Sequence, residues 1–233
     1  MRGPRVLCVA GDDPGAGAGL QRDRATVERL GGRFLGVVAV RTVQDQGGLR
    51  SVAVEPAEQI AAGIRSALEG GVDAVKTGAL GGAAAVEAVA AALADHPAVP
   101  LVVDPVRAAS KTAAAGVLLL DEPGWEALRR LLLPLAAVVT PNQPEFGDGR
   151  DYTGCAAVLV TGGHGGGDQV VDRLLRPGVP PVLYANPRLP GGHRVHGTGC
   201  ALSSALATGL GRGAPLERAV AEAIQAVRQL LQE

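Results

Sequence analysis

The chain has 233 residues, of which 47% are hydrophobic and only 2% aromatic, and its formal net charge is −1. A chain of this length buries one sizeable core, and the scarcity of aromatic side chains requires that Val, Leu, Ile and Ala fill it. The balanced charge, without a block of like charges, gives no electrostatic support to a role on nucleic acid or on a membrane surface.

The three cysteines, Cys8, Cys155 and Cys200, have neither metal-ligand nor disulfide spacing, which is typical of a protein of the reducing cytoplasm. The first apolar run, Val6–Ala10, is too short for the core of a signal peptide. No uninterrupted apolar stretch reaches the length of a transmembrane helix. We therefore expect a cytoplasmic protein.

Short β-branched segments alternate along the chain with Ala- and Leu-rich amphipathic segments. Such alternation predicts an α/β fold with a mainly parallel central sheet and helices on both faces, in which ligands bind beyond the carboxyl ends of the strands. We expect a single domain, 1–233, with no clear helix in the segment 141–155. The predicted strands are 5–10, 34–40, 74–77, 101–104, 137–140, 156–160 and 182–185, and the predicted helices are 19–30, 56–69, 83–94, 123–133, 199–211 and 215–232.

The strongest local signal is the turn His196–Cys200, which leads into a predicted helix. Gly197 and Gly199 flank Thr198, so several backbone N–H groups point toward one spot, and the helix dipole adds partial positive charge there. Such a nest suits the charge on a transferring phosphoryl group. Cys200 lies in the first helical turn, where the pKa of a thiol is expected to fall, so it is placed to accept a proton from a substrate hydroxyl. Taken alone, the turn fits a plain glycine-rich helix start equally well.

A second glycine-rich segment, 11–19, joins the first strand to the first helix. Gly15, Gly17 and Gly19 allow the backbone to approach a ligand closely, either a phosphate or a flat ring. The spacing is not that of a dinucleotide-binding fingerprint, and the chain contains no Gly-Lys-Ser/Thr for a Walker A loop. The number of glycines favours a ligand-binding segment over a plain strand-to-helix turn.

Polar side chains follow two further strands at the same predicted edge of the sheet. Asp104 follows one buried strand, and Asn142 and Glu145 follow the next. Oxygen ligands of this kind suit Mg²⁺ beside a nucleotide, although each residue taken singly is more often a turn or cap residue. Because both strand ends lie at the edge where a site is expected, together they favour a ligand site more strongly than either does alone.

Three more single candidates follow strands. His164, in the loop 161–164, either contacts phosphate or is an exposed loop residue. Gln44 offers a paired donor and acceptor that match the edge of a heterocycle. Lys76 fits a lysine at a strand end whose stem is packed.

The order of these motifs closely resembles the hydroxymethylpyrimidine and hydroxymethylpyrimidine-phosphate kinases of thiamine biosynthesis, within the ribokinase-like superfamily. The resemblance implies a ribokinase-like three-layer α/β sandwich that phosphorylates a pyrimidine alcohol, and then its monophosphate, with ATP and Mg²⁺. It covers nearly the whole chain through the segments 10–23, 44, 76–78, 104–106, 140–145, 162–164 and 196–200.

The resemblance assigns roles to matching positions of this sequence. Cys200 matches the proton acceptor, and Asn142 with Glu145 matches an N-x-x-E element that positions Mg²⁺ and its water shell. The full assignment is Cys200, Gly197, Thr198 and Gly199 for catalysis; Gly11, Gln44 and Asp23 for the pyrimidine; Asn142, Thr161 and His164 for ATP; and Asp104 and Glu145 for Mg²⁺.

Several positions depart from the family pattern. Thr161 stands where a lysine is usual, Ala79 and Arg107 stand where methionine is usual, and Asp12 stands where serine is typical. The missing lysine removes positive charge near the phosphates, and Arg107 adds charge near the pocket. Two alternatives therefore stay open: a kinase for another small alcohol, such as a pyridoxal-like vitamer or a nucleoside, and a catalytically weakened protein that binds a pyrimidine or nucleotide. The expected partner is a small pyrimidine, with no nucleic acid and no membrane, and the resemblance is compatible with a homodimer.

Overall fold

The fold is that of a computed structural model, which describes residues 2–12, 17–45, 48–108, 118–191 and 195–233. Its centre is a nine-stranded sheet of order β3-β2-β1-β4-β5-β6-β7-β8-β9. The six neighbouring strands β2, β1, β4, β5, β6 and β7 run parallel to one another. The edge strands β3, β8 and β9 pair antiparallel with their neighbours. The strands are β1 Arg5–Asp12, β2 Arg33–Asp45, β3 Gly48–Val54, β4 Ala74–Thr77, β5 Leu101–Val103, β6 Val138–Val139, β7 Val158–Val160, β8 Gln169–Arg176 and β9 Val179–Pro187.

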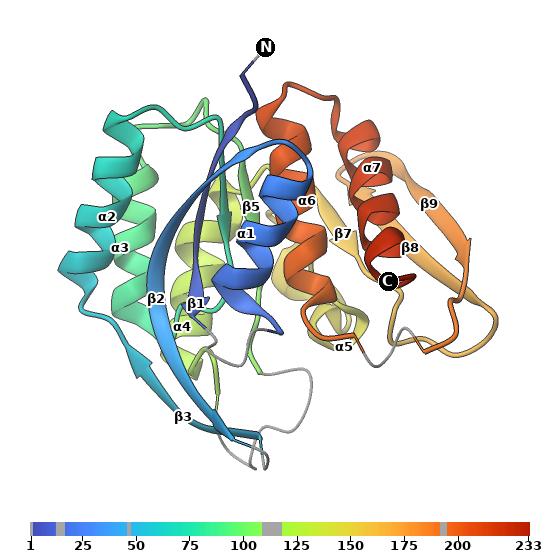
Figure 1. Ribbon diagram of the computed structural model, residues 1–233, viewed down its shortest axis with the longest axis horizontal. Helices are drawn as coiled ribbons and strands as arrows, with labels where there is room; N and C mark the ends of the chain where they lie inside the picture. The colour runs from blue at the N-terminus through green and yellow to red at the C-terminus, as the bar shows by residue number, and fades with distance from the viewer. Residues whose placement is uncertain (1, 13–16, 46–47, 109–117, 192–194) are drawn as a thin grey trace.

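Helices cover both faces of the sheet, which completes three layers (Figure 1). One core lies under α2, α3 and α4, and the other lies under α1, α6 and α7. No helix in the described ranges is long and apolar enough to cross a membrane. The α-helices are α1 Gly19–Arg29, α2 Ala57–Glu69, α3 Ala83–Leu93, α4 Glu122–Ala127, α5 Gln143–Phe146, α6 Thr198–Gly211 and α7 Leu216–Leu230.

The first strand explains why the sheet is covered on both sides. Leu7 and Val9 belong to one core, whereas Val6, Cys8 and Ala10 belong to the other. Successive side chains of a strand point to opposite faces, so a strand buried on both faces is apolar throughout. Each fully buried Val or Leu side chain contributes about 1.5–3 kcal/mol to folding, and these contributions hold β1 at the centre of the molecule.

The predicted α/β architecture is confirmed, and the differences lie in the details. The antiparallel strands β3 and β8 were not predicted, because polar residues, Arg50 and Ser51 in β3 and Asp172 and Arg173 in β8, interrupt their apolar runs. The predicted helix 123–133 is α-helical only to Ala127 and continues as a π-helical turn, Leu128–Leu132, and a 3-10 turn, Leu133–Leu135. Pro134 has no N–H to donate, which ends the helix there. The segment 141–155 holds only the single turn α5 and a 3-10 turn, Arg150–Tyr152.

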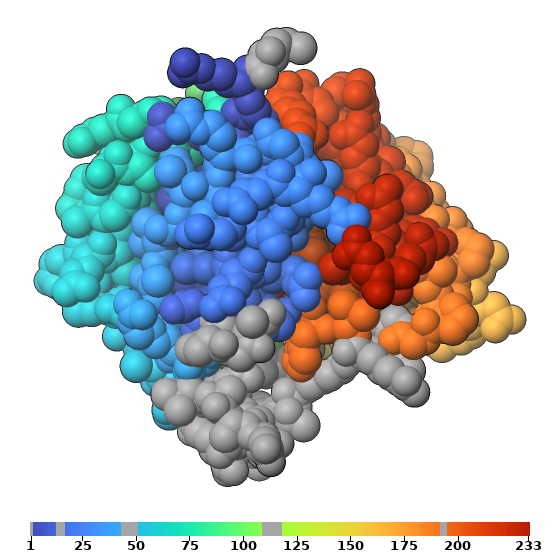
Figure 2. Space-filling view, in the orientation of Figure 1, coloured from blue at the N-terminus to red at the C-terminus, as the bar shows by residue number. Residues whose placement is uncertain are grey.

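The first and last helices of the chain share one face of the sheet. Figure 2 shows the N-terminal segment and the C-terminal helices side by side on the surface. Arg29 of α1 forms an ion pair with Glu233 beyond α7, and α1 and α6 lie together in the second core. This packing brings the start of α1 beside the start of α6.

Candidate active site

A cavity of about 970 Å³ opens at the carboxyl ends of the parallel strands. It collects segments that lie far apart in the sequence, as expected for a sheet of this topology. Among the residues that line it are these predicted ones: Gly11, Asp104, Asn142, Glu145, Thr161, His164, Gly197, Thr198, Gly199 and Cys200.

The two glycine-rich segments interlock at one end of the cavity. Gly197 is the N-cap of α6 with φ of 74°, and a Cβ there would lie 2.3 Å from the Gly17 carbonyl oxygen. A Cβ at Gly17 would in turn lie 2.9 Å from the Cβ of His196. Both positions therefore require glycine, and the contact fixes the first turn of α6 against the start of α1.

The first turn of α6 presents backbone donors to the cavity. The Ala201 N–H donates to the Gly197 carbonyl oxygen at 2.9 Å, so the helical bonds begin there. Gly197 has no side chain that could cap the N–H groups before Ala201. With the helix dipole they make this turn a site for an anion.

The Cys200 thiol differs from the sequence-based expectation. Burial raises its pKa to about 12; the Lys76 ammonium and the Gly19 N–H lower it, and Asp23 and Asp104 raise it further. The expected fall in pKa at a helix start is wrong here, because desolvation outweighs the helix dipole. The thiol is therefore protonated at neutral pH.

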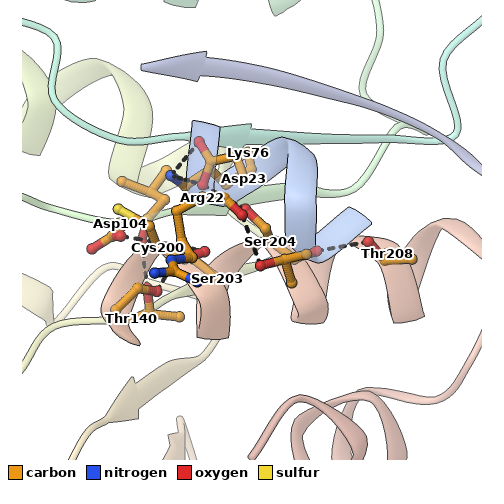
Figure 3. A network of polar contacts seen from close by, with 12 residues as sticks. Arg22, Asp23, Lys76, Asp104, Thr140, Cys200, Ser203, Ser204 and Thr208 are labelled. Atoms are coloured by element: carbon orange, nitrogen blue, oxygen red, sulfur yellow. Dashed lines mark hydrogen bonds and ion pairs between the residues drawn. The ribbon is translucent and has the colours of Figure 1, made fainter. Parts of the chain in front are cut away.

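A fully buried ion pair lies near Cys200 (Figure 3). The Lys76 ammonium donates to Asp23 Oδ1 and Oδ2 at 2.9 and 3.0 Å, and both side chains are inaccessible to solvent. The Ser204 hydroxyl of α6 donates to Asp23 Oδ1 at 2.7 Å. Burial lowers the pKa of Lys76, but Asp23, Cys200 and Asp104 outweigh this effect and raise it. Asp23, predicted as a substrate contact, therefore lies beneath the cavity as the partner of Lys76.

Asp104, directly after β5, and Glu145 of α5 are two of the carboxylates that line the cavity. The Asn142 side chain accepts from the Glu145 N–H, and Glu145 Oε2 accepts from the Asn142 N–H, each at 2.9 Å. This capping box holds both side chains at the rim. Burial raises the pKa of Asp104 to about 6, and the pKa of Glu145 to about 7 with repulsion from Asp104 as the second cause.

Asp104 and Glu145 fit a Mg²⁺ ion that takes its remaining ligands from phosphate and water. Within the described ranges, no group of three or more His, Cys, Asp or Glu side chains is placed to hold a metal ion. Mg²⁺ in phosphoryl-transfer sites needs only one or two carboxylates, because phosphate oxygens and water complete its shell. Repulsion between Asp104 and Glu145 is what a cation beside them would relieve.

The glycine-rich loop after β7 forms another wall of the cavity. Thr161, Gly163 and His164 line it, and the Gly162 N–H donates to Asp172 Oδ1 at 2.8 Å. The guanidinium of Arg188, beyond β9, donates to carbonyl groups of the loop. The loop is therefore held at several points.

An apolar slot lies between this loop and the C-terminal helices. Leu202 of α6 and Ile224 and Val227 of α7 line one side of the cavity, with Leu189 and Val195 from the connection before α6. A slot of this kind suits a flat aromatic ring, such as the base of a nucleotide. None of these residues was singled out from the sequence.

Sequence comparison identifies the family of the chain. Residues 13–148 and 150–233 match the family described as phosphomethylpyrimidine kinase. The chain belongs to this family. A hydroxymethylpyrimidine/phosphomethylpyrimidine kinase of Streptomyces coelicolor is 40% identical over 93% of this chain and 84% of its own length. The resemblance and the kinase class expected from the sequence are thereby confirmed.

Solved structures agree with the ribokinase-like fold expected for a phosphomethylpyrimidine kinase. The phosphomethylpyrimidine kinase of Clostridium difficile superposes with a TM-score of 0.80 at 27% identity, over 98% of this chain and 99% of that one. The pyridoxal kinase of Staphylococcus aureus, in complex with pyridoxal, gives 0.86 at 25% identity, over 99% and 88%. Its complex with AMP-PCP gives 0.83 at 26% identity, over 97% and 86%.

Some of the residues predicted from the sequence have no contact with the cavity among the described residues, or have other partners. Gly15 and the side chain of Gln44 lie outside the described residues. Arg107 lines the cavity, but its guanidinium donates to Glu122 at 2.7 Å and lies 5.0 Å from the centre of the Trp125 ring. Lys76 was expected to pack its aliphatic stem at a strand end, and its ammonium also forms an ion pair with Asp23.

Proposed function

We propose that the chain transfers the γ-phosphoryl group of ATP to 4-amino-5-hydroxymethyl-2-methylpyrimidine, and then to its monophosphate, as one domain in the cytoplasm. The observation that carries this proposal is the meeting of the first turn of α6 with Asp104 and Glu145 in one cavity. Backbone donors and a metal-binding carboxylate pair are what phosphoryl transfer requires. The family and the names of its members support the choice of substrate.

ATP would lie along the wall formed by the glycine-rich loop. Its base would occupy the apolar slot beside Leu202 and Ile224, and its phosphates would run past Thr161 and His164 toward Gly199. The AMP-PCP complex of the S. aureus pyridoxal kinase supports nucleotide binding by this fold. The pyrimidine would lie at the opposite end, against Gly11.

The transfer would take place at the first turn of α6. The hydroxymethyl oxygen forms a bond to the γ-phosphorus while the bond from that phosphorus to the leaving oxygen of ADP breaks. N–H groups of Thr198 and Gly199 hold the charge that develops on the transferring group. The Cys200 thiol, which lines the cavity, first releases its proton to water, and the resulting thiolate then accepts the hydroxyl proton. Lys76 favours that thiolate, because its ammonium lowers the raised pKa of Cys200.

Asp104 and Glu145 would hold Mg²⁺ together with the phosphates, with Asn142 keeping Glu145 in place through the capping box. When bound, Mg²⁺ supplies positive charge to the phosphates and offsets the Asp104 charge that raises the pKa of Cys200. The Ser203 hydroxyl donates to Asp104 Oδ2 at 3.1 Å, which fixes that carboxylate beside α6.

The test is turnover of hydroxymethylpyrimidine with Mg-ATP by wild type, Cys200→Ala and Cys155→Ala. Cys155 is a buried cysteine of the other core, so its substitution controls for general effects of losing a thiol. We expect roughly 10²-fold or greater loss of kcat in Cys200→Ala alone. Equal rates in all three proteins would refute the role of Cys200, and no turnover by wild type would refute the kinase function.

Pyridoxal is the second candidate substrate, because pyridoxal kinases superpose on this chain. The two substrates share a hydroxymethyl group on a flat heterocycle, so one cavity can accept either. The ratio of kcat/KM for the two compounds decides between them. For assembly we propose a homodimer, to be tested by the molar mass of the purified protein in solution.

A further inference from the structure

The guanidinium of Arg188 donates hydrogen bonds to several carbonyl groups of the glycine-rich loop after β7. Arg188 Nε donates to the Gly167 carbonyl oxygen at 2.9 Å, and Nη1 donates to that of Gly163 at 3.1 Å. Nη2 donates to the carbonyl oxygens of Gly165 at 2.7 Å and Gln169 at 3.4 Å. A guanidinium carries five donors in a rigid planar fork, so it can serve several carbonyls that an ammonium cannot reach together.

These bonds fix the direction of the loop peptides. In a trans peptide the carbonyl group and the N–H that follows it point in opposite directions. Because the carbonyls of Gly163, Gly165 and Gly167 point toward Arg188, the N–H groups of His164, Gly166 and Asp168 point away from it. We call these guanidinium bonds the Arg188 clamp. The clamp gives the loop one side of carbonyl acceptors, which bind Arg188, and an opposite side of N–H donors.

The start of the loop is held independently of Arg188. The Thr161 N–H donates to the Pro141 carbonyl oxygen at 2.9 Å, and the Gly162 N–H donates to the buried Asp172. A Cβ at Gly162 would lie 2.2 Å from the Val171 carbonyl oxygen, so this residue lies flat against β8. Beyond Gly162, the Arg188 guanidinium binds carbonyl groups of the loop, and the Arg188 backbone N–H donates to the Asp168 carbonyl oxygen at 2.7 Å.

We propose that Arg188 is a positioning residue for the nucleotide. It keeps Gly163 and His164, the loop residues that line the cavity beside Thr161, ordered for the phosphates, at the wall where this chain has Thr161 instead of a basic side chain. Glycine loses more conformational freedom on ordering than any other residue. Without the clamp, the nucleotide would have to order Gly163–Gly167 itself and would bind more weakly. The inference rests on the proposed function, because it assigns this wall of the cavity to ATP.

The test compares the binding of AMP-PCP and of hydroxymethylpyrimidine by calorimetry. Arg188→Met removes the clamp, and Arg188→Lys keeps the charge but loses the fork. Arg176→Met is the matched control, because Arg176 lies at the far end of β8 and pairs with Glu217. We expect both Arg188 variants to bind AMP-PCP roughly tenfold or more weakly. Their affinity for the pyrimidine should match that of wild type, which also verifies folding, and Arg176→Met should bind both ligands normally.

A rescue experiment separates the clamp from a general structural effect. Millimolar guanidinium ion should restore part of the AMP-PCP affinity of Arg188→Ala and should leave wild type unchanged. Normal AMP-PCP binding by Arg188→Met or by Arg188→Lys would overturn the inference, as would equal loss of both ligands without rescue. If wild type itself binds no AMP-PCP, the assignment of this wall to ATP fails first, which is a distinguishable result.

Discussion

Replacing Lys76 by methionine removes the ammonium and keeps most of the side-chain volume. Asp23 then loses the partner that contacts both of its oxygens at 2.9 and 3.0 Å and retains the Ser204 hydroxyl at 2.7 Å. The carboxylate is fully buried and has no access to water. It must therefore either remain charged without a counter-ion or take up a proton.

The expected loss of stability is large. Breaking a buried ion pair by removing one partner costs about 3–5 kcal/mol, because the other charge stays desolvated. A domain is stable by only about 5–15 kcal/mol, so the variant loses a substantial part of the total. In Asp23→Asn/Lys76→Met neither buried charge remains, and at least half of the loss should be recovered.

Urea unfolding at pH 7.5 measures these differences for both single variants and the double variant. Arg218→Met is the matched control, because Arg218 forms an exposed pair with Glu222 at 2.8 Å, and no measurable change is expected. A Lys76→Met variant as stable as wild type would refute the reasoning. So would a double variant whose loss equals the sum of the two single losses, because the charges would then be uncoupled.

Three further predictions follow from the site. Asp104 has its pKa raised from 3.8 to about 6, so the folded protein holds a proton that the unfolded chain has lost, and stability falls as pH rises through that window. Asp104→Asn should therefore be more stable than wild type by about 3 kcal/mol at pH 8, with the gain nearly absent at pH 4; urea unfolding at both values tests this, and an equal gain at both would contradict it. Glu145, with a pKa near 7, must lose its proton to bind Mg²⁺, so the Mg²⁺ concentration for half-maximal rate should rise roughly tenfold from pH 8 to pH 6; a flat dependence would count against Glu145 as a ligand. Gly197→Ala and Gly178→Ala share positive φ values, 74° and 69°, but only Gly197 meets backbone at 2.3 Å. Gly178→Ala should lose about 1 kcal/mol of stability and keep its activity, whereas Gly197→Ala should lose stability and also roughly 10²-fold in kcat. Equal kcat values for the two variants would contradict the role given to Gly197.

Much of the fold was predictable because the buried parallel strands produce continuous apolar runs. Val6–Ala10 identified β1 for this reason, and the polar residues directly after such strands, Asp104 and Asn142, identified the edge where the cavity lies. Strand β8 was missed because Asp172 and Arg173 interrupt its pattern, although Asp172 is buried by its bond to Gly162.

The rest depended on contacts between residues that are distant in sequence. Asp23 and Lys76 are 53 positions apart, so the motif that contains Asp23 gave no sign that an ion pair buries it. The pKa of Cys200 was predicted from its place in a helix, whereas burial determines it. Arg188 had no signal of its own, because its role depends on a loop that the hairpin of β8 and β9 brings beside it.

The central claim, phosphoryl transfer to a pyrimidine alcohol, is tested most directly by the mass of the product. Purified chain, Mg-ATP and 4-amino-5-hydroxymethyl-2-methylpyrimidine are incubated, and the mono- and diphosphates of the pyrimidine are followed with time, beside a parallel reaction with pyridoxal. We predict that the pyrimidine monophosphate appears first and the diphosphate follows. Unchanged pyrimidine, with pyridoxal phosphate formed in the parallel reaction or with no phosphorylated product in either, would contradict this account.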